Sequence, residues 1–379
     1  MYEYQKTNRY FAQVAAGMEE LGAVELKALG AQQVAPDFRG IYFEASRDVV
    51  YRINYCSRLI SRVLAPLVKF HCHSPKYLYK KCREIRWDQF FSIDKTFAVF
   101  ANVSRSQISH SQYAALNVKD AIVDHFREMT GERPNVERIE PDVAINLHID
   151  SNFATVSWDV SGGALHRRGY RRQSVDAPMQ ETLAAAIIKL SGWNGELPLY
   201  DPFCGSGTLL IEALMRHCKI PAGFLREKFG FESLPDFEID LWRQVKLEAD
   251  KQIEEFDVGL IAGSDISAAA TKIAVNNLAM LPGGDRVQIN TKPFNQIEKL
   301  EHRIIVGNPP YGIRQGKKEE ISSLYRQLGD FLKQRCQRST AYFYFGDRSL
   351  IPCVGLKPAW RKPLSNGGLD GRLVRFDIY

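Results

Sequence analysis

Short apolar runs alternate with helical stretches between residues 179 and 345, and this alternation limits the possible folds more than any other feature of the sequence. Buried strands separated by helices are typical of a parallel sheet, because each strand then needs a crossover connection. We expect a mostly parallel sheet covered by helices on both faces and closed by an edge hairpin at residues 371–379. The predicted strands cover residues 197–200, 259–263, 286–289, 304–307 and 341–345, and the predicted helices cover 179–190, 209–218, 240–255, 268–280 and 319–336.

The loop that follows the predicted strand at residues 304–307 reads Asn308-Pro309-Pro310-Tyr311-Gly312. Its two prolines remove two N–H donors and make the loop stiff and extended. Open α/β sheets bind ligands at the carboxyl ends of their strands. The Asn308 side-chain oxygen and the Pro309 carbonyl suit the two N–H groups of an exocyclic amine on a nucleobase, with Tyr311 stacked on its ring. The alternative is a plain turn in which Asn308 caps the loop.

A second motif lies at a predicted strand-to-helix turn, from Asp201 to Thr208, and reads Asp-Pro-Phe-Cys-Gly-Ser-Gly-Thr. Gly205 and Gly207 allow the backbone to approach a ligand closely. The motif lacks the Gly-Lys-Ser/Thr of a P-loop, and it lacks the third glycine of the dinucleotide fingerprint. Asp201 precedes the glycines instead, and a carboxylate suits a cationic amino-acid group better than a pyrophosphate.

A second carboxylate, Asp265, lies at the end of the next predicted strand, where an acid can bind both hydroxyls of a ribose. A ligand that combines an ammonium, a ribose and an adenine is S-adenosylmethionine, which we predict as the cofactor. Each acid taken alone has a simpler explanation, because Asp201 and Asp265 also stand where helix caps are found. Two acids and the loop at 308–312 on three strand ends favour the cofactor.

The composition is typical of a soluble globular protein, and 379 residues predict two or three domains. No apolar run reaches membrane-spanning length, and the first residues lack the apolar core of a signal peptide. Seven scattered cysteines predict free thiols in a reducing cytoplasm. His71, Cys72, His73 and Cys82 have no second ligand pair at zinc spacing, so we predict no metal site.

Positive charge is concentrated in the first part of the chain. The net charge is +6, and residues 1–173 carry 24 Lys and Arg against 19 Asp and Glu. One basic cluster runs from Arg62 to Arg86, with Tyr77 and Tyr79 inside it, and a second spans residues 166–172. Basic clusters that include aromatic residues indicate a phosphate-backbone partner. The alternative is a set of solvated surfaces.

The amino-terminal pattern differs from the βα alternation. Residues 9–15, 40–45 and 61–70 read as strands, and residues 19–29 and 48–60 read as helices, which predicts a ferredoxin-like domain at 1–70. In the next part we expect helices at 75–85 and 110–129, a strand at 97–104, and a hairpin of strands at 143–149 and 153–159. This basic region contains no carboxylate pair or nucleophile–base pair, so we expect it to bind rather than catalyse.

The two motifs, together with Leu165 to Arg171 (Leu-His-Arg-Arg-Gly-Tyr-Arg) and Ala177 to Ala184 (Ala-Pro-Met-Gln-Glu-Thr-Leu-Ala), resemble the THUMP-containing RNA guanine-N2 methyltransferases, most closely the RlmL/YpsC-like branch. The resemblance implies four parts, a ferredoxin-like domain at 1–70, a THUMP RNA-binding domain at 71–160, a basic linker at 161–176 and a Rossmann-like class I methyltransferase domain at 177–379. The implied fold class is therefore α/β with two α+β modules before it.

The resemblance also implies roles for individual residues. The implied target-base and catalytic residues are Asn308, Pro309 and Tyr311. The implied cofactor residues are Asp201, Phe203, Gly205, Gly207, Thr208, Asp265, Ile266 and Asn308. The basic residues expected to bind RNA are Lys76, Lys80, Lys81, Arg83, Arg167, Arg168, Arg171 and Arg172.

The function implied is methyl transfer from S-adenosylmethionine to the exocyclic N2 of a guanosine, in 23S (large-subunit) ribosomal RNA. The alternatives are guanine N2 in transfer RNA, adenine N6 in DNA, and a non-enzymatic RNA-binding assembly factor. In two respects the chain departs from the family. The family often has an acid near the adenine, but here residues 290–295 read Asn-Thr-Lys-Pro-Phe-Asn, so Phe294 is a candidate to stack there instead. The chain ends at Tyr379, without a second methyltransferase half, so we expect one modification.

Overall fold

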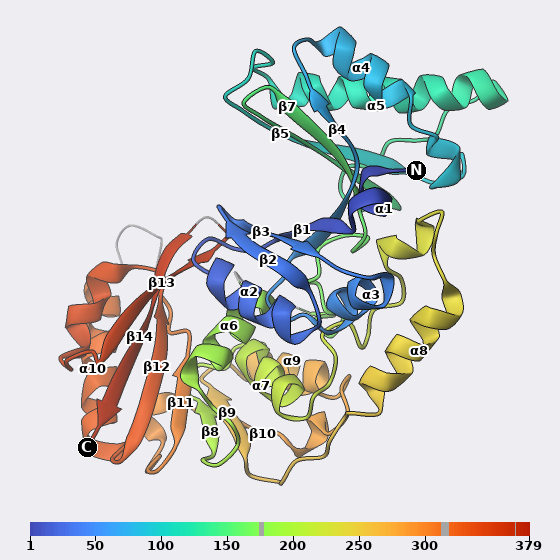
Figure 1. The fold of residues 1–379 in the computed structure, drawn as a ribbon. Helices are drawn as coiled ribbons and strands as arrows, with labels where there is room; N and C mark the ends of the chain where they lie inside the picture. Colours follow the sequence, from blue (N-terminus) through green and yellow to red (C-terminus); the bar gives the residue numbers. More distant parts are fainter. Residues whose placement is uncertain (174–177, 312–317, 368) are drawn as a thin grey trace. The chain divides into compact units, whose positions relative to one another are not determined.

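Two seven-stranded sheets organise the chain, one in each of two units (Figure 1). The computed structural model describes residues 1–173, 178–311, 318–367 and 369–379. The first unit contains residues 1–14, 22–165 and 226–247, and the second contains residues 15–21, 166–225 and 248–379. The predicted division at residues 70, 160 and 176 stays a prediction.

The first sheet has the strand order β2-β3-β1-β4-β7-β6-β5, and only the pair β5 and β6 is parallel. Its strands are β1 (Arg9–Gln13), β2 (Gln32–Asp37), β3 (Gly40–Glu44), β4 (Arg62–His71), β5 (Phe97–Ser104), β6 (Val143–Asp150) and β7 (Phe153–Asp159). The helices with most of their residues in this unit are α1 (Glu3–Thr7), α2 (Glu19–Ala28), α3 (Arg47–Cys56), α4 (Pro75–Arg83), α5 (Ser111–Thr130) and α8 (Ile239–Asp250), with 3-10 helices at Trp87–Gln89 and Gly230–Ser233.

Side chains alternate between two faces of this sheet, and one face forms the core of the unit. On β6, Ile145, Leu147 and Ile149 are buried, whereas His148 points the other way and is exposed. Helices α4 and α5 lie on one side of strands β4, β5 and β7 in Figure 1. Each fully buried aliphatic side chain stabilises the fold by about 1.5–3 kcal/mol relative to an exposed one. The apolar alternation of the strands therefore decides which face the helices cover.

Strand β4 is shared by the two halves of the sheet. Its beginning pairs with β1 and its remainder, from Leu64 to His71, pairs with β7. A register shift between Pro66 and Val68 marks a β-bulge, which suits a proline that cannot donate to the ladder. The predicted ferredoxin-like and second α+β patterns are therefore built on one continuous sheet.

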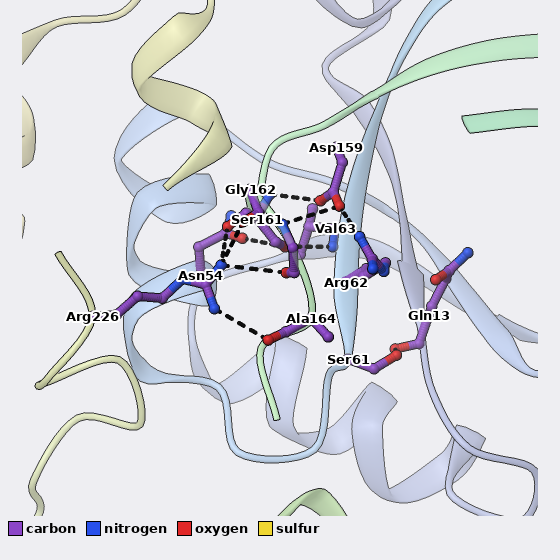
Figure 2. Close-up of polar contacts among 11 residues, drawn as sticks. Gln13, Asn54, Ser61, Arg62, Val63, Asp159, Ser161, Gly162, Ala164 and Arg226 are labelled. Carbon is purple, nitrogen blue, oxygen red and sulfur yellow. Dashed lines mark hydrogen bonds and ion pairs between the residues drawn. The ribbon is translucent and has the colours of Figure 1, made fainter. Parts of the chain in front are cut away.

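A segment from the middle of the chain packs onto this unit through Arg226 (Figure 2). The Arg226 guanidinium donates to the carbonyls of Ser161 and Gly162 at 2.8 Å each, and to that of Ala164 at 3.1 Å. A cationic donor makes stronger hydrogen bonds than a neutral one. Arg226 thus fastens the segment 226–247 to the turn that ends β7.

The same turn is anchored by a buried acid. Asp159 is 1% exposed, forms an ion pair with Arg62, and accepts a hydrogen bond from the Ser161 amide at 2.9 Å. Burial raises the pKa of Asp159, and the nearby Arg62 guanidinium counteracts this. The Ser161 hydroxyl continues the network, since it donates to Asn54 Oδ1 at 2.7 Å and accepts from the Val63 amide at 2.8 Å.

The second sheet has the strand order β10-β9-β8-β11-β12-β14-β13, in which only β14 is antiparallel to its neighbours. Its strands are β8 (Leu199–Asp201), β9 (Ile261–Asp265), β10 (Gln288–Thr291), β11 (Ile304–Gly307), β12 (Ser339–Phe345), β13 (Trp360–Asn366) and β14 (Leu369–Ile378). Its helices are α6 (Glu181–Ser191), α7 (Thr208–His217), α9 (Ala268–Leu278) and α10 (Lys318–Arg335), with 3-10 helices at Gly284–Arg286, Phe294–Gln296 and Arg348–Val354.

This topology confirms the predicted mostly parallel sheet and reveals a reversal at its centre. The chain runs outward from β8 through β9 to β10, and then returns to place β11 on the other side of β8. Ligands of open α/β sheets bind beyond the carboxyl ends of the strands at such a reversal. No helix among the described residues is long and apolar enough to cross a membrane.

Two edge strands were not predicted from the sequence. β2 is almost wholly exposed and contains Pro36, so it carries no alternating burial pattern. β13 contains Pro363 and two basic residues, which suits an edge strand. The expected hairpin at 371–379 is therefore longer and consists of β13 (Trp360–Asn366) and β14 (Leu369–Ile378), with β14 between β12 and β13. Helix α8 ends at Asp250, five residues before the predicted Glu255.

Replacing Arg226 by Ala should lower the free energy of unfolding by about 2–4 kcal/mol, because several charge-assisted hydrogen bonds to backbone carbonyls are lost together. Urea denaturation followed by tryptophan fluorescence measures this, since Trp242 packs edge-on against Tyr55 in the same unit. Arg243→Ala is the matched control, because that arginine makes only an exposed pair with Asp240. Equal stability of the two variants would contradict the role of Arg226.

Candidate active site

Three polar residues meet at the carboxyl edge of the second sheet. Asp201 ends β8, Asp265 ends β9 and Asn308 follows β11. Because β8 lies between β9 and β11, Asp201 stands between the other two. The pairing of Asp201 with Gly263 and of Tyr200 with Ile305 fixes the register of the three strands. The parallel topology thus brings together three residues that are 43 to 107 positions apart in sequence.

The loop between β8 and α7 is held by its own backbone. The Cys204 amide donates to the Ser264 carbonyl at 3.0 Å, and the Gly207 amide donates to the Cys204 carbonyl at 2.7 Å. Gly207 has φ +85°, and a Cβ added there would stand 3.2 Å from the Ala274 side chain. Both the left-handed conformation and the close approach favour glycine. The loop therefore ends directly at the amino terminus of α7, where backbone N–H groups are unpaired within the helix.

Asp265 holds the backbone of two loops. One carboxylate oxygen accepts from the Gly205 amide and the other accepts from the Ser267 amide, each at 2.9 Å. The side chain is partly exposed. Each carboxylate oxygen has a second lone pair, so both oxygens can accept one further hydrogen bond. Asp265 therefore fits a pair of hydroxyl donors without giving up its structural contacts.

Asp201 is a buried acid without a cationic partner. It is 1% exposed, and one oxygen accepts from the Phe203 amide at 2.9 Å. Burial raises its pKa well above the usual carboxyl range, and the charge of Asp265 raises it further. No Lys, Arg or His among the described residues forms an ion pair with Asp201. An ionised carboxylate at this depth needs a positive charge, which a ligand can provide.

The loop after β11 brings its polar groups close to Asp201. A Cβ added to Gly307 would lie 3.5 Å from Asp201 Oδ1 and 2.8 Å from the Phe343 ring, so glycine is required for the approach. Asn308 Oδ1 is buried and accepts no hydrogen bond from any residue that the structure describes. An unpaired buried acceptor costs about 1–3 kcal/mol, which a ligand with an N–H donor would relieve.

The remainder of this loop is held against the core. The Tyr325 hydroxyl donates to the Pro309 carbonyl at 3.5 Å, which leaves one lone pair of that carbonyl. The Tyr311 ring is half-buried and covers Gly346, where an added Cβ would meet it at 2.7 Å. Gly312 of the predicted motif lies outside the described residues. The loop that follows Gly307 thus presents two acceptors and a ring, and Gly307 itself adjoins the buried carboxyl of Asp201.

Comparisons with known proteins show which protein domains the chain contains. Residues 168–375 match the RMKL-like methyltransferase domain, residues 72–159 match the THUMP domain, and residues 9–64 match the RlmL ferredoxin-like domain. The chain belongs to the RMKL-like methyltransferase family.

Related proteins support this over nearly the whole length. The methyltransferase is 39% identical, over 98% of its own chain and 97% of the relative, to "Putative RNA methyltransferase slr0064" of Synechocystis. It is 38% identical to "Ribosomal RNA large subunit methyltransferase K/L" of Syntrophotalea carbinolica, over 98% of this chain and 53% of that protein. The chain thus spans about half the length of the K/L relatives.

Solved structures share the fold. "SMU.472, a putative methyltransferase complexed with SAH" has a TM-score of 0.84 at 27% identity, with 98% of each chain covered. "A predicted N6-adenine-specific DNA methylase" from Listeria monocytogenes has a TM-score of 0.85 at 26% identity, covering 99% of this chain and 97% of that one. The predicted fold class, with its ferredoxin-like and THUMP modules, is confirmed, and so is S-adenosylmethionine as the cofactor.

The residues at the sheet edge fit that cofactor, although their individual assignments stay predictions. Asp201 suits the ammonium group and Asp265 suits the ribose hydroxyls. Ile266 is 74% exposed directly beyond β9, where an apolar side chain can contact an adenine. Phe203 is partly buried, with its ring 5.1 Å from that of Phe294. Phe294 is only 6% exposed, so its suggested stacking on the adenine is not supported.

Part of the basic cluster at 166–172 proves to be structural. Arg168 is 2% exposed, with Nε 3.3 Å from Glu212 Oε1, and the Tyr170 hydroxyl donates to the same oxygen at 3.3 Å. Breaking a buried pair of this kind typically costs about 3–5 kcal/mol. The prediction that Arg168 binds RNA phosphates is therefore wrong, because its guanidinium neutralises a buried acid of α7. Arg167 and Arg172, on either side, are exposed.

Arg171 is likewise directed into the methyltransferase unit. Its guanidinium donates to the Met179 carbonyl at 2.8 Å and to Thr208 Oγ1 at 2.9 Å, and it lies 3.5 Å from Glu181. Burial raises the pKa of Glu181, and the Arg171 charge opposes that shift. The expected phosphate contact of Arg171 is corrected accordingly. Thr208 accepts this hydrogen bond at the start of α7, and its predicted contact with the cofactor stays a prediction.

The predicted basic residues of α4 divide into two kinds. Lys76 and Lys80 are exposed and lie on one face of the helix, four residues apart. Lys81 pairs with Glu84 at 2.9 Å, and Arg83 pairs with Glu128. Lys76 and Lys80 therefore remain the stronger RNA-binding predictions. No group of three or more potential metal ligands occurs among the described residues, and Cys72 and Cys82 are buried there.

Several contributors to this site were not predicted from the sequence. Tyr325 is fully buried on α10 and contacts the Pro309 carbonyl, but an isolated tyrosine 16 residues later gives no signal. Glu212 did give a signal in the sequence, because it is a charged residue inside the otherwise apolar start of α7. Read together with the nearby arginine run, it predicts a buried ion pair.

Binding of S-adenosylhomocysteine should release up to about one proton and strengthen as the pH rises. Burial raises the pKa of Asp201 in the ligand-free protein, and the ligand's ammonium lowers it, so Asp201 loses its proton on binding at any pH between the two values. The same shift predicts that the ligand-free protein loses stability as the pH rises through the raised pKa. Titration calorimetry in two buffers of different ionisation enthalpy measures the proton release.

Two variants complete this experiment. Asp201→Asn should abolish the proton release and weaken binding, whereas Asp285→Asn, at an exposed acid of the same unit, should change neither. A wild-type protein with identical binding enthalpy in both buffers would refute the proposed ionisation.

Proposed function

We propose that this methyltransferase transfers a methyl group from S-adenosylmethionine to the exocyclic amine of a base in RNA, with guanine N2 of large-subunit ribosomal RNA as the target. The observation that carries the proposal is the unpaired Asn308 Oδ1 beside Asp201, at the central strand reversal. An acceptor there is suited to an N–H group next to the cofactor's cationic part.

Asn308 and Pro309 would activate the amine by geometry. The lone pair of an exocyclic amine is delocalised into the base ring, which makes the amine a poor nucleophile. Acceptors on both N–H groups favour a tetrahedral nitrogen and direct the lone pair toward the methyl group. Asn308 Oδ1 and the remaining lone pair of the Pro309 carbonyl are two such acceptors. Alignment of this kind contributes roughly 7–11 kcal/mol in well-oriented reactions.

The other residues would hold the two reactants in place. Bound S-adenosylmethionine supplies a methyl group on a positively charged sulfur. Asp201 would bind the ammonium of the amino-acid part, Asp265 the ribose, and the backbone of the Gly205–Gly207 loop would lie against the ligand. Tyr311 would stack on the base with the ring face opposite Gly346. No strong base is needed, because methylation acidifies the amine and its proton then passes to water.

Two comparisons support RNA as the substrate. The THUMP domain occupies residues 72–159, and the K/L relatives are named as methyltransferases of large-subunit ribosomal RNA. Lys76, Lys80, Arg167 and Arg172 are exposed, as phosphate contacts require. The target base must leave its stack to reach Asn308, at a cost of a few kcal/mol. Transfer RNA remains an alternative substrate with the same chemistry.

Adenine N6 is the second candidate target. Its amine offers the same two N–H groups, and one related structure is described as an N6-adenine-specific DNA methylase. Methyl transfer from labelled cofactor to total RNA and, separately, to genomic DNA of a strain lacking this gene, followed by nuclease digestion and mass spectrometry of the nucleosides, separates the candidates. Labelled N2-methylguanosine supports the proposal, whereas labelled N6-methyladenosine or label in DNA alone refutes it.

Replacing Asn308 by Ala should lower kcat at least about 100-fold, comparable to the loss of one transition-state hydrogen bond, while cofactor affinity stays within a few-fold. Single-turnover methylation measures the first quantity and calorimetry with S-adenosylhomocysteine the second. Asn295→Ala is the control, because its side chain is exposed. Normal turnover of Asn308→Ala would end the proposed mechanism. A wild-type protein that binds RNA but no S-adenosylhomocysteine would favour the assembly-factor alternative.

A further inference from the structure

Among the described residues of the first unit, helices cover one face of the sheet and leave the other uncovered. In a β-ladder, directly opposed residues point to the same face, so the pairing fixes the members of each face. The covered face carries Ile145, Val156 and Trp158, which are buried. We call the other one the open face, and its members in the β4–β7–β6–β5 half are Lys69, His71, Phe100, Asn102, Ser104, Asn146, His148, Asp150, Phe153 and Thr155.

Aromatic rings are exposed on this face. Phe153 is 51% exposed and Phe100 is 39% exposed, although both belong to regular strands. Tyr42, 51% exposed, shares the face, because it opposes Phe11, which in turn opposes Leu64 of β4. Single exposed apolar residues are normal, but three rings on one side of a continuous sheet form a surface that favours flat partners.

Polar groups that suit a nucleic acid surround the rings. His71 packs edge-on against Phe153 at 5.3 Å between centroids, and both His71 and His148 are exposed. Lys69 is exposed on the same face and forms no ion pair among the described residues. Exposed rings beside an unpaired cation are the groups that bind bases and phosphates of unpaired RNA.

A paired helix does not fit these groups equally well. Double-stranded RNA presents phosphates and 2′-hydroxyls, and its base faces are stacked on one another. Exposed rings on a sheet gain nothing from that surface, whereas they stack on the free faces of unpaired bases. An acidic protein partner would use Lys69 but not the exposed rings.

We propose that the open face binds a single-stranded segment of the substrate RNA, with bases stacked on Phe100 and Phe153 and a phosphate at Lys69. This deepens the proposed function, on which it rests for the identity of the ligand as RNA. The second α+β module thereby acts as a reader of unpaired nucleotides. Its contribution to affinity comes from stacking and does not depend on the sequence of the segment.

Fluorescence anisotropy with a labelled 12-nucleotide oligouridine tests the proposal on the full chain. Phe153→Ala and Phe100→Ala should each weaken binding about 5- to 100-fold, because one stacked base is lost. Phe153→Trp should bind oligouridine about as well as the wild type, because tryptophan keeps a ring at this position. Tyr113→Ala is the matched control, since Tyr113 is 54% exposed on α5, which lies on the covered side. Thermal melting checks that every variant is folded.

Salt dependence gives an independent readout. Lys69→Gln should reduce the slope of log affinity against log salt by about 0.7, the value for one phosphate contact on a single strand. An RNA duplex of the same length should compete poorly. Equal oligouridine affinity of the wild type and both phenylalanine variants would overturn the proposal. So would variants that lose affinity for the duplex and for oligouridine to the same extent, because that result indicates a general phosphate-binding surface.

Methylation of RNA by the same variants separates this inference from the proposed function. Wild-type protein that binds oligouridine through Phe100 and Phe153 but methylates no RNA would refute the proposed function and leave the open face as an RNA site. If the wild-type protein methylates RNA and the Phe100→Ala/Phe153→Ala double variant has the same KM for RNA, the proposed function stands and RNA binding at the open face is refuted. A higher KM with unchanged kcat supports both.

Discussion

The active site depends on one buried carboxylate at the end of the central strand. Asp201 is shielded from water and has no cationic partner among the described residues, so the ligand-free protein favours its neutral form. The surrounding structure preserves this situation. Gly307 brings β11 close to the acid without filling the space, and the Phe203 amide orients one oxygen. A site of this kind binds cations selectively, because only a positive charge recovers the cost of the burial. S-adenosylmethionine carries such a charge at its amino-acid end.

The second unit could largely be predicted from the sequence because its information is local. Each strand is a short apolar run, each helix follows at once, and the functional residues stand at strand ends. Parallel topology then brings Asp201, Asp265 and Asn308 to one edge without any knowledge of packing. The edge strands β2 and β13 could not be found in this way, since an exposed edge has neither an apolar run nor an alternation.

The arginine run at 167–172 shows a different limit. Net charge alone favours a phosphate-binding surface, but successive residues of an extended segment point in opposite directions. Arg167 and Arg172 are exposed, whereas Arg168 is paired with Glu212 inside the unit. The partner acid was visible in the sequence as a charge within an apolar helix. What the sequence did not contain was the pairing, which joins positions 44 residues apart. The segment 226–247 is a similar case, because Phe231 and Trp242 of that segment pack with Tyr51 of α3, nearly 200 residues earlier.

The chemistry of the Asn308 loop places the source of base selectivity elsewhere. Its acceptors contact only N–H groups, and guanine N2 and adenine N6 present these equally. A choice between the two bases requires contacts to ring atoms that differ, such as the guanine O6 and N1–H or the unsubstituted adenine C2. The prolines of this loop lack N–H groups and the Tyr311 ring is held against Gly346, so its backbone offers few donors for such contacts. Discrimination would then draw on other residues around the base and on the placement of the RNA by the first unit. A protein that relies on placement needs tight, shape-dependent RNA binding more than a selective pocket, and this is consistent with a chain that devotes nearly half of its length to modules without catalytic groups.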